Sequence, residues 1–289
     1  MNDPRSISVS TQVCAVVGNP VAHSLSPAIH NAAFEFLGLD FIYVACKVED
    51  VKGALAGVRA MRNFRGLSVT IPHKIEVMKY VDEVAEVDRA IGSINTVIHE
   101  QDRLIGLGTD GPAAQKAIAD AGVEMDAKNL LMLGAGGAAR AIAFTLARST
   151  KFRQLSILDI NETLLEGLTT DLVTGTGAAV GGALLSDSSL AAAMADADVI
   201  IHCTPVGMHP NEDASLIPSH LFRRGQTVFD IVYTPLETKL VMEAKSRGLQ
   251  VIPGVEMFIN QAALQFEHFT GTAAPVEVMR QVVMKHFRS

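Results

Sequence analysis

Two charged residues, Lys74 and Asp110, stand where they could transfer a proton. Lys74 ends the run Ser68-Val-Thr-Ile-Pro-His-Lys, and Pro72 is expected to start a helix with Lys74 in its first turn. A cation there faces the positive end of the helix dipole, which favours the neutral amine that can accept a proton. Asp110 lies in a turn-rich loop leading into the second domain. The alternatives are an exposed lysine without a chemical role and an aspartate that caps the helix starting at Pro112.

Hydroxyl and amide side chains form a second set of candidates, suited to binding a polar anion. Ser24 and Ser26 precede an expected helix, and a helix N-terminus is a favourable place for a carboxylate. Ser26 is also the expected N-cap of that helix, with Pro27 in its first turn, and both uses can hold together. Asn95 could donate its amide to a substrate hydroxyl, although a turn at a strand edge is the commoner use of asparagine.

A glycine-rich turn indicates a dinucleotide site in the second part of the chain. The apolar run 129–133 has the length of a strand, residues 140–147 have a helical pattern, and residues 154–159 form a second apolar run. Between the first strand and the helix stand Gly134, Ala135, Gly136, Gly137 and Ala138. Such a turn lets backbone N–H groups approach a pyrophosphate at the positive end of the helix dipole. Asp159, about 20 residues beyond the glycines, could accept hydrogen bonds from ribose hydroxyls.

Composition argues against several functional classes. The 289 residues, 48% hydrophobic and 19% charged, predict a folded protein rather than a disordered one. A net charge of -7 without a basic cluster argues against nucleic acid as a partner. The most apolar window, 130–147, contains glycines and Arg140, so we expect no membrane span. The histidines show no metal-site spacing with acids, so we expect no bound metal.

Cysteine usage and the first residues favour a cytoplasmic protein. Cys14, Cys46 and Cys203 lie far apart, without metal-ligand pairs or a disulfide framework, which suits a reducing compartment. Residues 1–6 lack the basic and apolar pattern of a signal peptide. A homodimer is a candidate oligomeric state, which the sequence leaves open.

The order of elements predicts an α/β protein with two domains. In residues 1–111 short apolar runs alternate with helical patterns, whereas residues 112–255 show the helix–strand–glycine turn–helix–strand pattern of a doubly wound Rossmann-type sheet. Residues 256–289 are helical and could pack on either domain, because periodicity alone does not choose. The expected strands are 13–17, 41–46, 66–71, 96–98, 104–106, 129–133, 154–159, 178–180, 199–202, 227–232 and 250–252.

Taken together, the motifs resemble those of the shikimate dehydrogenase family. They occur in the order found in that family and span roughly residues 14–271, nearly the whole chain, which makes chance agreement very unlikely. The matching segments are Gly18–Pro27 with His30 and Asn31, Val69–Lys74, Gly92–Thr96, Gly106–Gly111, Gly134–Ala139, Asp230–Pro235, Gly254–Met257 and Gln261–Ala263.

The resemblance implies an N-terminal substrate-binding and catalytic domain, 1–111, completed by helices 256–289. A cleft would separate it from an NAD(P)-binding Rossmann domain, 112–255. It also implies reversible hydride transfer between NAD(P) and a ring carbon of shikimate or quinate, with Lys74 and Asp110 handling the hydroxyl proton. The implied substrate-binding residues are Ser24, Ser26, Thr70, Asn95, Tyr233 and Gln261. The implied cofactor-binding residues, besides the glycine turn and Asp159, are Asn161, Thr204, Ile231 and Gly254.

Three departures from the family pattern bear on specificity. Asparagine is common in the family where this chain has Ser68 and Gly108, and both positions neighbour the implied substrate site. At the end of the second strand of the nucleotide-binding domain, the NADP-using pattern has an arginine that clasps the 2′-phosphate. Here the run is Asp159-Ile-Asn161, whose carboxylate would repel a phosphate. We therefore expect NAD as the preferred cofactor, with NADP as the alternative.

Other functions fit parts of the pattern. A non-catalytic metabolite sensor could keep the fold and the ligand site, but it would need neither Lys74 nor Asp110. A dehydrogenase for another cyclic hydroxy acid would use the same machinery. A methylene-tetrahydrofolate-type dehydrogenase shares the architecture, but it would not explain the paired serines.

Overall fold

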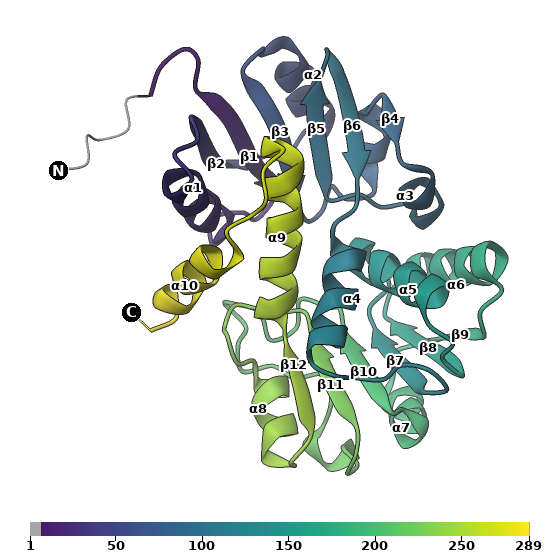
Figure 1. Cartoon of the computed structure of the whole chain (residues 1–289). Helices are drawn as coiled ribbons and strands as arrows, with labels where there is room; N and C mark the ends of the chain where they lie inside the picture. The colour runs from purple at the N-terminus through teal and green to yellow at the C-terminus, as the bar shows by residue number, and fades with distance from the viewer. Residues whose placement is uncertain (1–6, 289) are drawn as a thin grey trace. The chain divides into compact units, whose positions relative to one another are not determined.

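The chain folds into two α/β units, each built on a six-stranded sheet (Figure 1). The first unit comprises the chain up to Thr109 and again from Gln261 onward, and the second unit is Asp110–Asn260. The computed structural model describes residues 7–288. Residues 1–6, where the sequence lacks a signal-peptide pattern, lie outside this described part.

A mixed sheet forms the first unit. β1 pairs in parallel with β2 and β3, and β5 pairs antiparallel with β3 and β6. β1, which lies between β2 and β3, is apolar from Val13 to Val17, as expected for a strand covered on both faces. In spatial order the strands are β2 (Phe41–Lys47), β1 (Gln12–Gly18), β3 (Phe64–Val69), β5 (Thr96–Glu100), β6 (Arg103–Leu107) and β4 (Glu83–Val84).

Alternate residues of these strands face different helices, because side chains in a strand point to opposite faces in turn. Leu67 and Val69 pack with α2 (Val51–Ala60) and the 3-10 helix η1 (Glu76–Tyr80) in one buried cluster. The intervening Gly66 and Ser68 face the part of α9 (Gly254–Thr270) that belongs to this unit. α1 (Ser26–Phe36) packs on β1, β2 and α10 (Val276–His286), and α3 (Glu86–Ile91) precedes β5.

The second unit has a fully parallel sheet. Read from β9, the strands are the third, second, first, fourth, fifth and sixth of the unit, which is the Rossmann order. The predicted fold class is therefore confirmed, although β9 lies a few residues later than expected. The strands in spatial order are β12 (Gln250–Pro253), β11 (Thr227–Asp230), β10 (Val199–His202), β7 (Asn129–Leu133), β8 (Gln154–Asp159) and β9 (Val180–Leu184).

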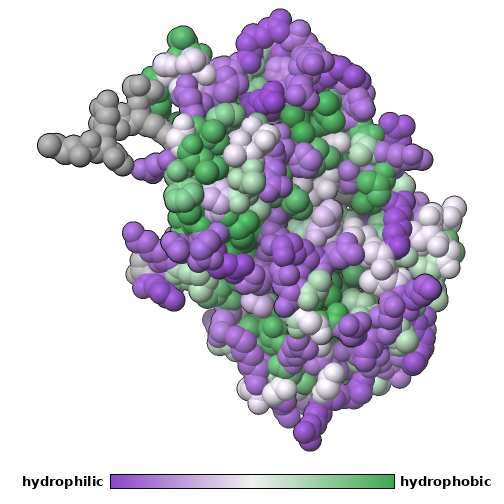
Figure 2. Space-filling model, viewed as in Figure 1, coloured by the Kyte–Doolittle hydropathy of each residue, from purple (hydrophilic) through white to green (hydrophobic). Residues whose placement is uncertain are grey.

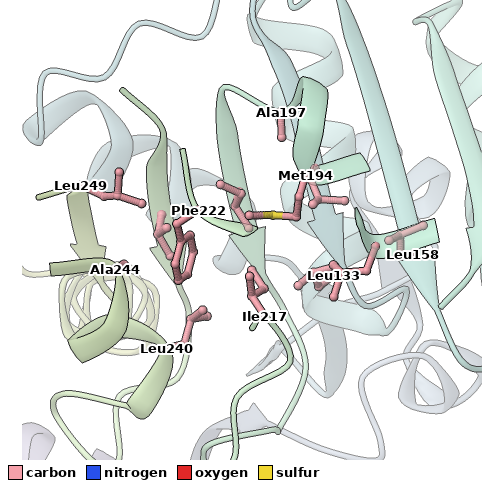
Figure 3. Close-up of a cluster of buried hydrophobic side chains, with 13 residues drawn as sticks. Leu133, Leu158, Met194, Ala197, Ile217, Phe222, Leu240, Ala244 and Leu249 are labelled. Atoms are coloured by element: carbon pink, nitrogen blue, oxygen red, sulfur yellow. The ribbon is translucent and has the colours of Figure 1, made fainter. Parts of the chain in front are cut away.

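Helices pack against this parallel sheet. Figure 3 shows the core that α7 (Asp187–Asp196) and α8 (Lys239–Ser246) form with the strands, in which Met194, Ile217 and Phe222 lie close together. α5 (Gly137–Ser149) packs between α4 (Asp110–Asp120) and α6 (Glu162–Thr176), and α6 also contacts β8 and β9.

The surface is mixed in character. Figure 2 shows hydrophilic residues over most of the face in view, with hydrophobic residues in smaller groups between them. Within residues 7–288, no helix combines the length and the apolar composition that crossing a membrane requires.

Met194 supplies a test of this core. The side chain is fully buried in the cluster of Figure 3, so Met194→Ala should remove about 2–5 kcal/mol from the free energy of unfolding by leaving a cavity. Met242 in α8 is 51% exposed, so Met242→Ala should change the same quantity by less than about 0.5 kcal/mol. Urea denaturation of both variants measures the difference, and equal losses would contradict the assigned core.

Candidate active site

The predicted substrate residues of the first unit follow from one edge of its sheet. β1 and β3 are parallel, so their carboxyl ends lie together, and the segments 19–26 and 70–75 leave the sheet there. β5 runs antiparallel to β3, which places its first residue, Thr96, beside Ser68 at that edge. Because β6 is antiparallel to β5 in turn, it also ends there, with Leu107 opposite Thr96. Four segments distant in sequence therefore converge.

A glycine allows two of these segments to touch. A Cβ atom on Gly18 would collide with Cγ2 of Thr70 and would lie 2.9 Å from the carbonyl oxygen of Ile71. The backbone N–H of Thr70 donates to Val17, and that of Asn19 donates to Ile71. Thr70 is thus held against the start of the segment that carries Ser24 and Ser26.

Lys74 occupies a series of turns, not the first turn of a helix as predicted. Residues 71–75 are turns, and the short 3-10 helix η1 starts only at Glu76. The carbonyl oxygen of Lys74 accepts the N–H of Ile94, a long-range bond that fixes the residue beside the segment leading into β5. The argument from the helix dipole was therefore wrong, and Lys74 is positioned by backbone pairing instead. Its side chain is half-buried.

The two serines also differ from the prediction. Ser26 is the first residue of α1, the N-cap is Leu25, and no side chain caps the helix. The hydroxyl of Ser24 accepts the N–H of Ser26 at 3.3 Å. The capping role predicted for Ser26 was wrong, and the hydroxyl that serves the helix end is that of Ser24.

Asn95 holds the end of the first unit in place. Its side-chain oxygen accepts the N–H of Thr109 at 2.8 Å, and its amide donates to the Thr109 hydroxyl at 2.9 Å. Its backbone carbonyl accepts the N–H of Val69. Asn95 therefore connects β3, through its backbone carbonyl, with Thr109, through its side chain, and Asp110 is the next residue in the chain. Asp110 is 6% exposed and is the first residue of α4, so it lies inside the helix that it was expected to cap.

Gln265 is an important residue that the sequence analysis missed. Its amide donates to the carbonyl of Asn95 and to the hydroxyl of Thr96, and its side-chain oxygen accepts from Ser68. The Ser68 hydroxyl in turn accepts from Tyr43 at 2.5 Å. Ser68 is buried with donor and acceptor both engaged, so it supports the edge of the sheet. Gln261 stands one helical turn before Gln265 on the same face of α9, a spacing that could have drawn attention to the pair.

The second departure from the family pattern, Gly108, has a steric reason. A Cβ atom at this position would lie 2.6 Å from Oδ1 of the buried Asp88. An asparagine could enter only if the Asp88 carboxylate moved. Both departures are therefore accommodated by internal packing within the first unit.

His30 is buried without a hydrogen-bond partner for either ring nitrogen among the described residues. Its ring stacks on Tyr43, with centroids 4.3 Å apart. Burial lowers the pKa of His30 to about 3, so the ring is neutral at physiological pH and acts as a packing surface. Within residues 7–288, no group of three or more histidines, cysteines and acids is arranged to hold a metal.

In the second unit the glycine turn has the backbone that a dinucleotide needs. Gly134 follows β7 with φ at +107°, and a Cβ there would lie 3.0 Å from the carbonyl oxygen of Cys203. Gly136 is the N-cap of α5, and a Cβ on it would meet no atom within 4 Å. Free space therefore lies beside a helix N-terminus, where N–H groups lack helical partners. These residues fit a bound pyrophosphate.

Asp159 closes this turn from the next strand. Its carboxylate accepts the N–H of Ala135 at 2.6 Å and that of Asn161 at 2.7 Å. Each carboxylate oxygen can accept a further bond, so a ribose hydroxyl can still be bound. The Asn161 side chain caps α6 by accepting the N–H of Leu164 at 3.0 Å.

The remaining predicted residues of the second unit lie after β10, β11 and β12. Gly254 packs against backbone, since a Cβ on it would lie 2.6 Å from the carbonyl oxygen of Ile231. Thr204 contacts the glycine turn, because its Cγ2 would lie 3.2 Å from a Cβ on Gly134. Tyr233 stacks on Phe258, with ring centroids 4.1 Å apart. The structure thus places Thr204 beside Gly134, and Ile231 beside Gly254.

A surface cavity of about 420 Å³ lies elsewhere in this unit. Its lining includes Asn129 and Gln154, the first residues of β7 and β8, together with Gly181 and Ala193. None of the predicted site residues lines it. Ligands of open parallel sheets bind at the carboxyl ends of the strands, so this cavity is not the candidate site.

Comparison with known proteins shows the family to which this chain belongs. Residues 16–97 match the shikimate dehydrogenase substrate binding domain, and residues 254–284 match the shikimate 5′-dehydrogenase C-terminal domain. The chain is 41% identical over 287 residues to a protein of Methanosarcina mazei named shikimate dehydrogenase (NADP(+)), covering 95% of this chain and 98% of the relative. The chain belongs to the shikimate dehydrogenase family.

Solved structures of shikimate dehydrogenases have the same fold. One in complex with NADP+ superposes with a TM-score of 0.88 at 36% identity, covering 98% of each chain. Shikimate 5-dehydrogenase of Listeria monocytogenes, in complex with shikimate and NAD, gives a TM-score of 0.87 at 31% identity, covering 98% of this chain and 100% of that one. The fold and the family therefore agree with the resemblance seen in the sequence.

The two glycines of the turn should respond differently to alanine. Gly136→Ala should change the free energy of unfolding by less than about 1 kcal/mol, because the methyl group enters empty space. It should nevertheless weaken NADH binding by about tenfold or more, because it fills the space that the pyrophosphate needs.

Gly134→Ala is the matched comparison. It should lower stability by about 1–3 kcal/mol, since alanine is strained at this positive φ. Fluorescence titration with NADH and thermal melting measure the two effects. Unchanged NADH affinity in Gly136→Ala would contradict the site.

Proposed function

We propose that this chain catalyses the reversible, nicotinamide dinucleotide-dependent interconversion of shikimate and 3-dehydroshikimate. The observation that carries the proposal is the edge of the first sheet, where the segments bearing Ser24, Thr70, Lys74 and Asn95 converge. These groups offer hydroxyls, an amide and a cation, which suit a small polyhydroxylated carboxylate. Relatives named shikimate dehydrogenase align with this chain over nearly its whole length.

Each unit has its own part in the proposal. The first unit, with Ser24, Ser26, Thr70, Asn95 and Gln261, binds the substrate. The second unit binds the dinucleotide through the glycine turn, Asp159, Thr204, Ile231 and Gly254. Tyr233, which belongs to the second unit, adds a substrate contact.

Lys74 and Asp110 handle the proton of the reacting hydroxyl. When the ring carbinol becomes a ketone, the hydroxyl oxygen loses its proton, and a positioned base lowers the barrier by accepting it. The nicotinamide, when bound, supplies the hydride chemistry. In the reverse direction Lys74 returns a proton to the forming hydroxyl.

The cofactor preference that we propose is NAD. Between Arg153 and Arg223 the sequence has no lysine or arginine but nine acidic residues, and this stretch contains β8, where the adenosine ribose binds in a Rossmann sheet. Ile160, directly after Asp159, is 81% exposed, and Leu164 in the first turn of α6 is 37% exposed. Exposed aliphatic side chains and a carboxylate give a 2′-phosphate no partner. Relatives named shikimate dehydrogenase (NADP(+)) use NADP by name, so the proposed preference for NAD separates this chain from them.

Steady-state kinetics test the proposal directly. Purified protein should reduce NAD with shikimate, and the assay should be repeated with quinate and with NADP. Turnover of quinate in preference to shikimate would move the assignment to the quinate branch. Tight binding of shikimate without turnover of either acid, with either cofactor, would contradict an enzyme and favour a metabolite sensor.

Lys74→Ala should lower kcat by about 10²- to 10⁴-fold, with a much smaller change in KM, because the lost proton transfer acts mainly in the transition state. Lys79→Ala is the matched control, since Lys79 is exposed in η1 and has no part in the proposed site. Initial rates of NADH formation from shikimate measure both variants. A near-normal kcat in Lys74→Ala would remove this residue from the mechanism.

Ile160→Arg should raise the ratio of kcat/KM for NADP to that for NAD by about 10- to 100-fold. A guanidinium there can form charge-assisted hydrogen bonds with the 2′-phosphate. Val173→Arg, which adds the same charge at a 48% exposed position of α6 beyond its first turns, should leave the ratio unchanged. Equal ratios in Ile160→Arg and the wild type would count against the ribose assignment.

A further inference from the structure

A chain of buried polar side chains runs through the carboxyl ends of β10 and β11. His202 and Asp230 have side chains 1% and 0% exposed, and Nδ1 of His202 lies 2.8 Å from Oδ1 of Asp230. Nε2 of the same ring lies 2.6 Å from the hydroxyl oxygen of Thr204. None of the expected proton-transfer roles involves His202 or Asp230, so the burial of this pair needs another explanation.

The hydrogen bonds around Asp230 fix the tautomer of His202. Asp230 accepts the N–H of Val232 at 3.0 Å on Oδ1 and the hydroxyl of Thr238 at 2.5 Å on Oδ2. A carboxylate accepts only, so the hydrogen between the two side chains is on Nδ1 of His202. Nε2, on the other side of the ring, is bonded to the Thr204 hydroxyl, so the ring links that hydroxyl to the buried carboxylate.

This arrangement orients Thr204 completely. Its hydroxyl oxygen also accepts the N–H of Val206 at 3.2 Å, and a hydroxyl can make one bond more. Thr204 is half-buried, and its methyl group lies beside the glycine turn at Gly134. The hydroxyl therefore keeps one hydrogen-bonding position for a ligand, beside the place where the dinucleotide is proposed to bind.

We propose that His202 is a positioning residue that holds the Thr204 hydroxyl in place for a hydrogen bond with the dinucleotide. The bonded group is a ribose hydroxyl or the carboxamide of the nicotinamide. The inference rests on the proposed dinucleotide site but not on the identity of the acid that is oxidised. Asp230 acts through His202, and it also binds the N–H of Val232, next to the segment that packs on Gly254.

The proposal predicts that His202 and Thr204 act as one unit in binding. His202→Asn keeps a polar group beside Asp230 but is too short to reach Thr204, and Thr204→Val removes the hydroxyl with little change in shape. Each should raise the Kd for NADH by about 3- to 10-fold, the size expected for one lost hydrogen bond. The double variant should bind no more weakly than Thr204→Val alone, because His202 has nothing left to orient. Thr204→Ser should bind as the wild type does.

Equilibrium titration of NADH fluorescence, without any acid substrate, measures the Kd of the four variants and of the wild type, and thermal melting reports their stability. His99→Asn is the control, because His99 is a buried histidine of the first unit bonded to the carbonyl of Phe64. It should leave the Kd unchanged. Additive effects in the double variant, or a normal Kd in folded His202→Asn, would overturn the proposal.

Thr204→Val tests the inference even if His202→Asn does not fold. If Thr204→Val binds NADH with wild-type affinity, the Thr204 hydroxyl makes no bond for His202 to position, and the inference is overturned. Failure of the proposed function gives a different result, since a protein that binds NADH normally but oxidises neither shikimate nor quinate keeps the coupling and loses only the substrate assignment.

Discussion

The proposed site of the first unit depends on the hydrogen bonds of the Gln265 carboxamide. This carboxamide joins α9 to the carbonyl of Asn95 and to Thr96 at the start of β5, and through Ser68 it reaches β3. All these groups are buried, so breaking one bond would leave a polar atom without a hydrogen-bond partner. The free energy of unfolding would then fall by about 1–3 kcal/mol. The same Asn95 binds the N–H of Thr109, the residue before Asp110. The proposed substrate-binding segments and the chain leading to a proposed catalytic carboxylate are thus fixed by one polar cluster.

In the second unit, a buried carboxylate holds loop segments in place in a similar way. Asp230 binds His202, Val232 and Thr238, and Thr238 caps α8 in turn. The Asp159 carboxylate likewise fixes the glycine turn by accepting the N–H of Ala135. Ion pairs such as Lys116–Asp120 and Arg103–Glu83 are exposed, and pairs of this kind contribute little. The geometry of both candidate sites therefore rests on buried hydrogen bonds to backbone groups, which hold loop segments where helices and strands end.

Local patterns predicted the parts of the structure that depend on local physics. The order of strand, glycine turn, helix, strand and acid was enough for the Rossmann sheet, because each element there has its own sequence signal. The segment after Pro72 was predicted as a helix, and it forms turns because the carbonyl of Lys74 pairs with Ile94, a bond that no local pattern reports. The packing of α9 on β3 depends on Gln265 and Ser68, far apart in sequence. For the same reason His202 drew no attention beside Thr204, since its partner Asp230 is on another strand.

The proposed reaction and the proposed cofactor can be tested together, because both concern direct hydride transfer from the ring carbon of the acid to the nicotinamide. The most direct test uses shikimate deuterated at the carbon that bears the reacting hydroxyl, with NAD as acceptor and the product analysed by NMR. We expect NADH that carries deuterium at C4, formed faster than NADPH is formed when NADP replaces NAD. NADH without deuterium, or no NADH from protein that binds both ligands, would contradict it.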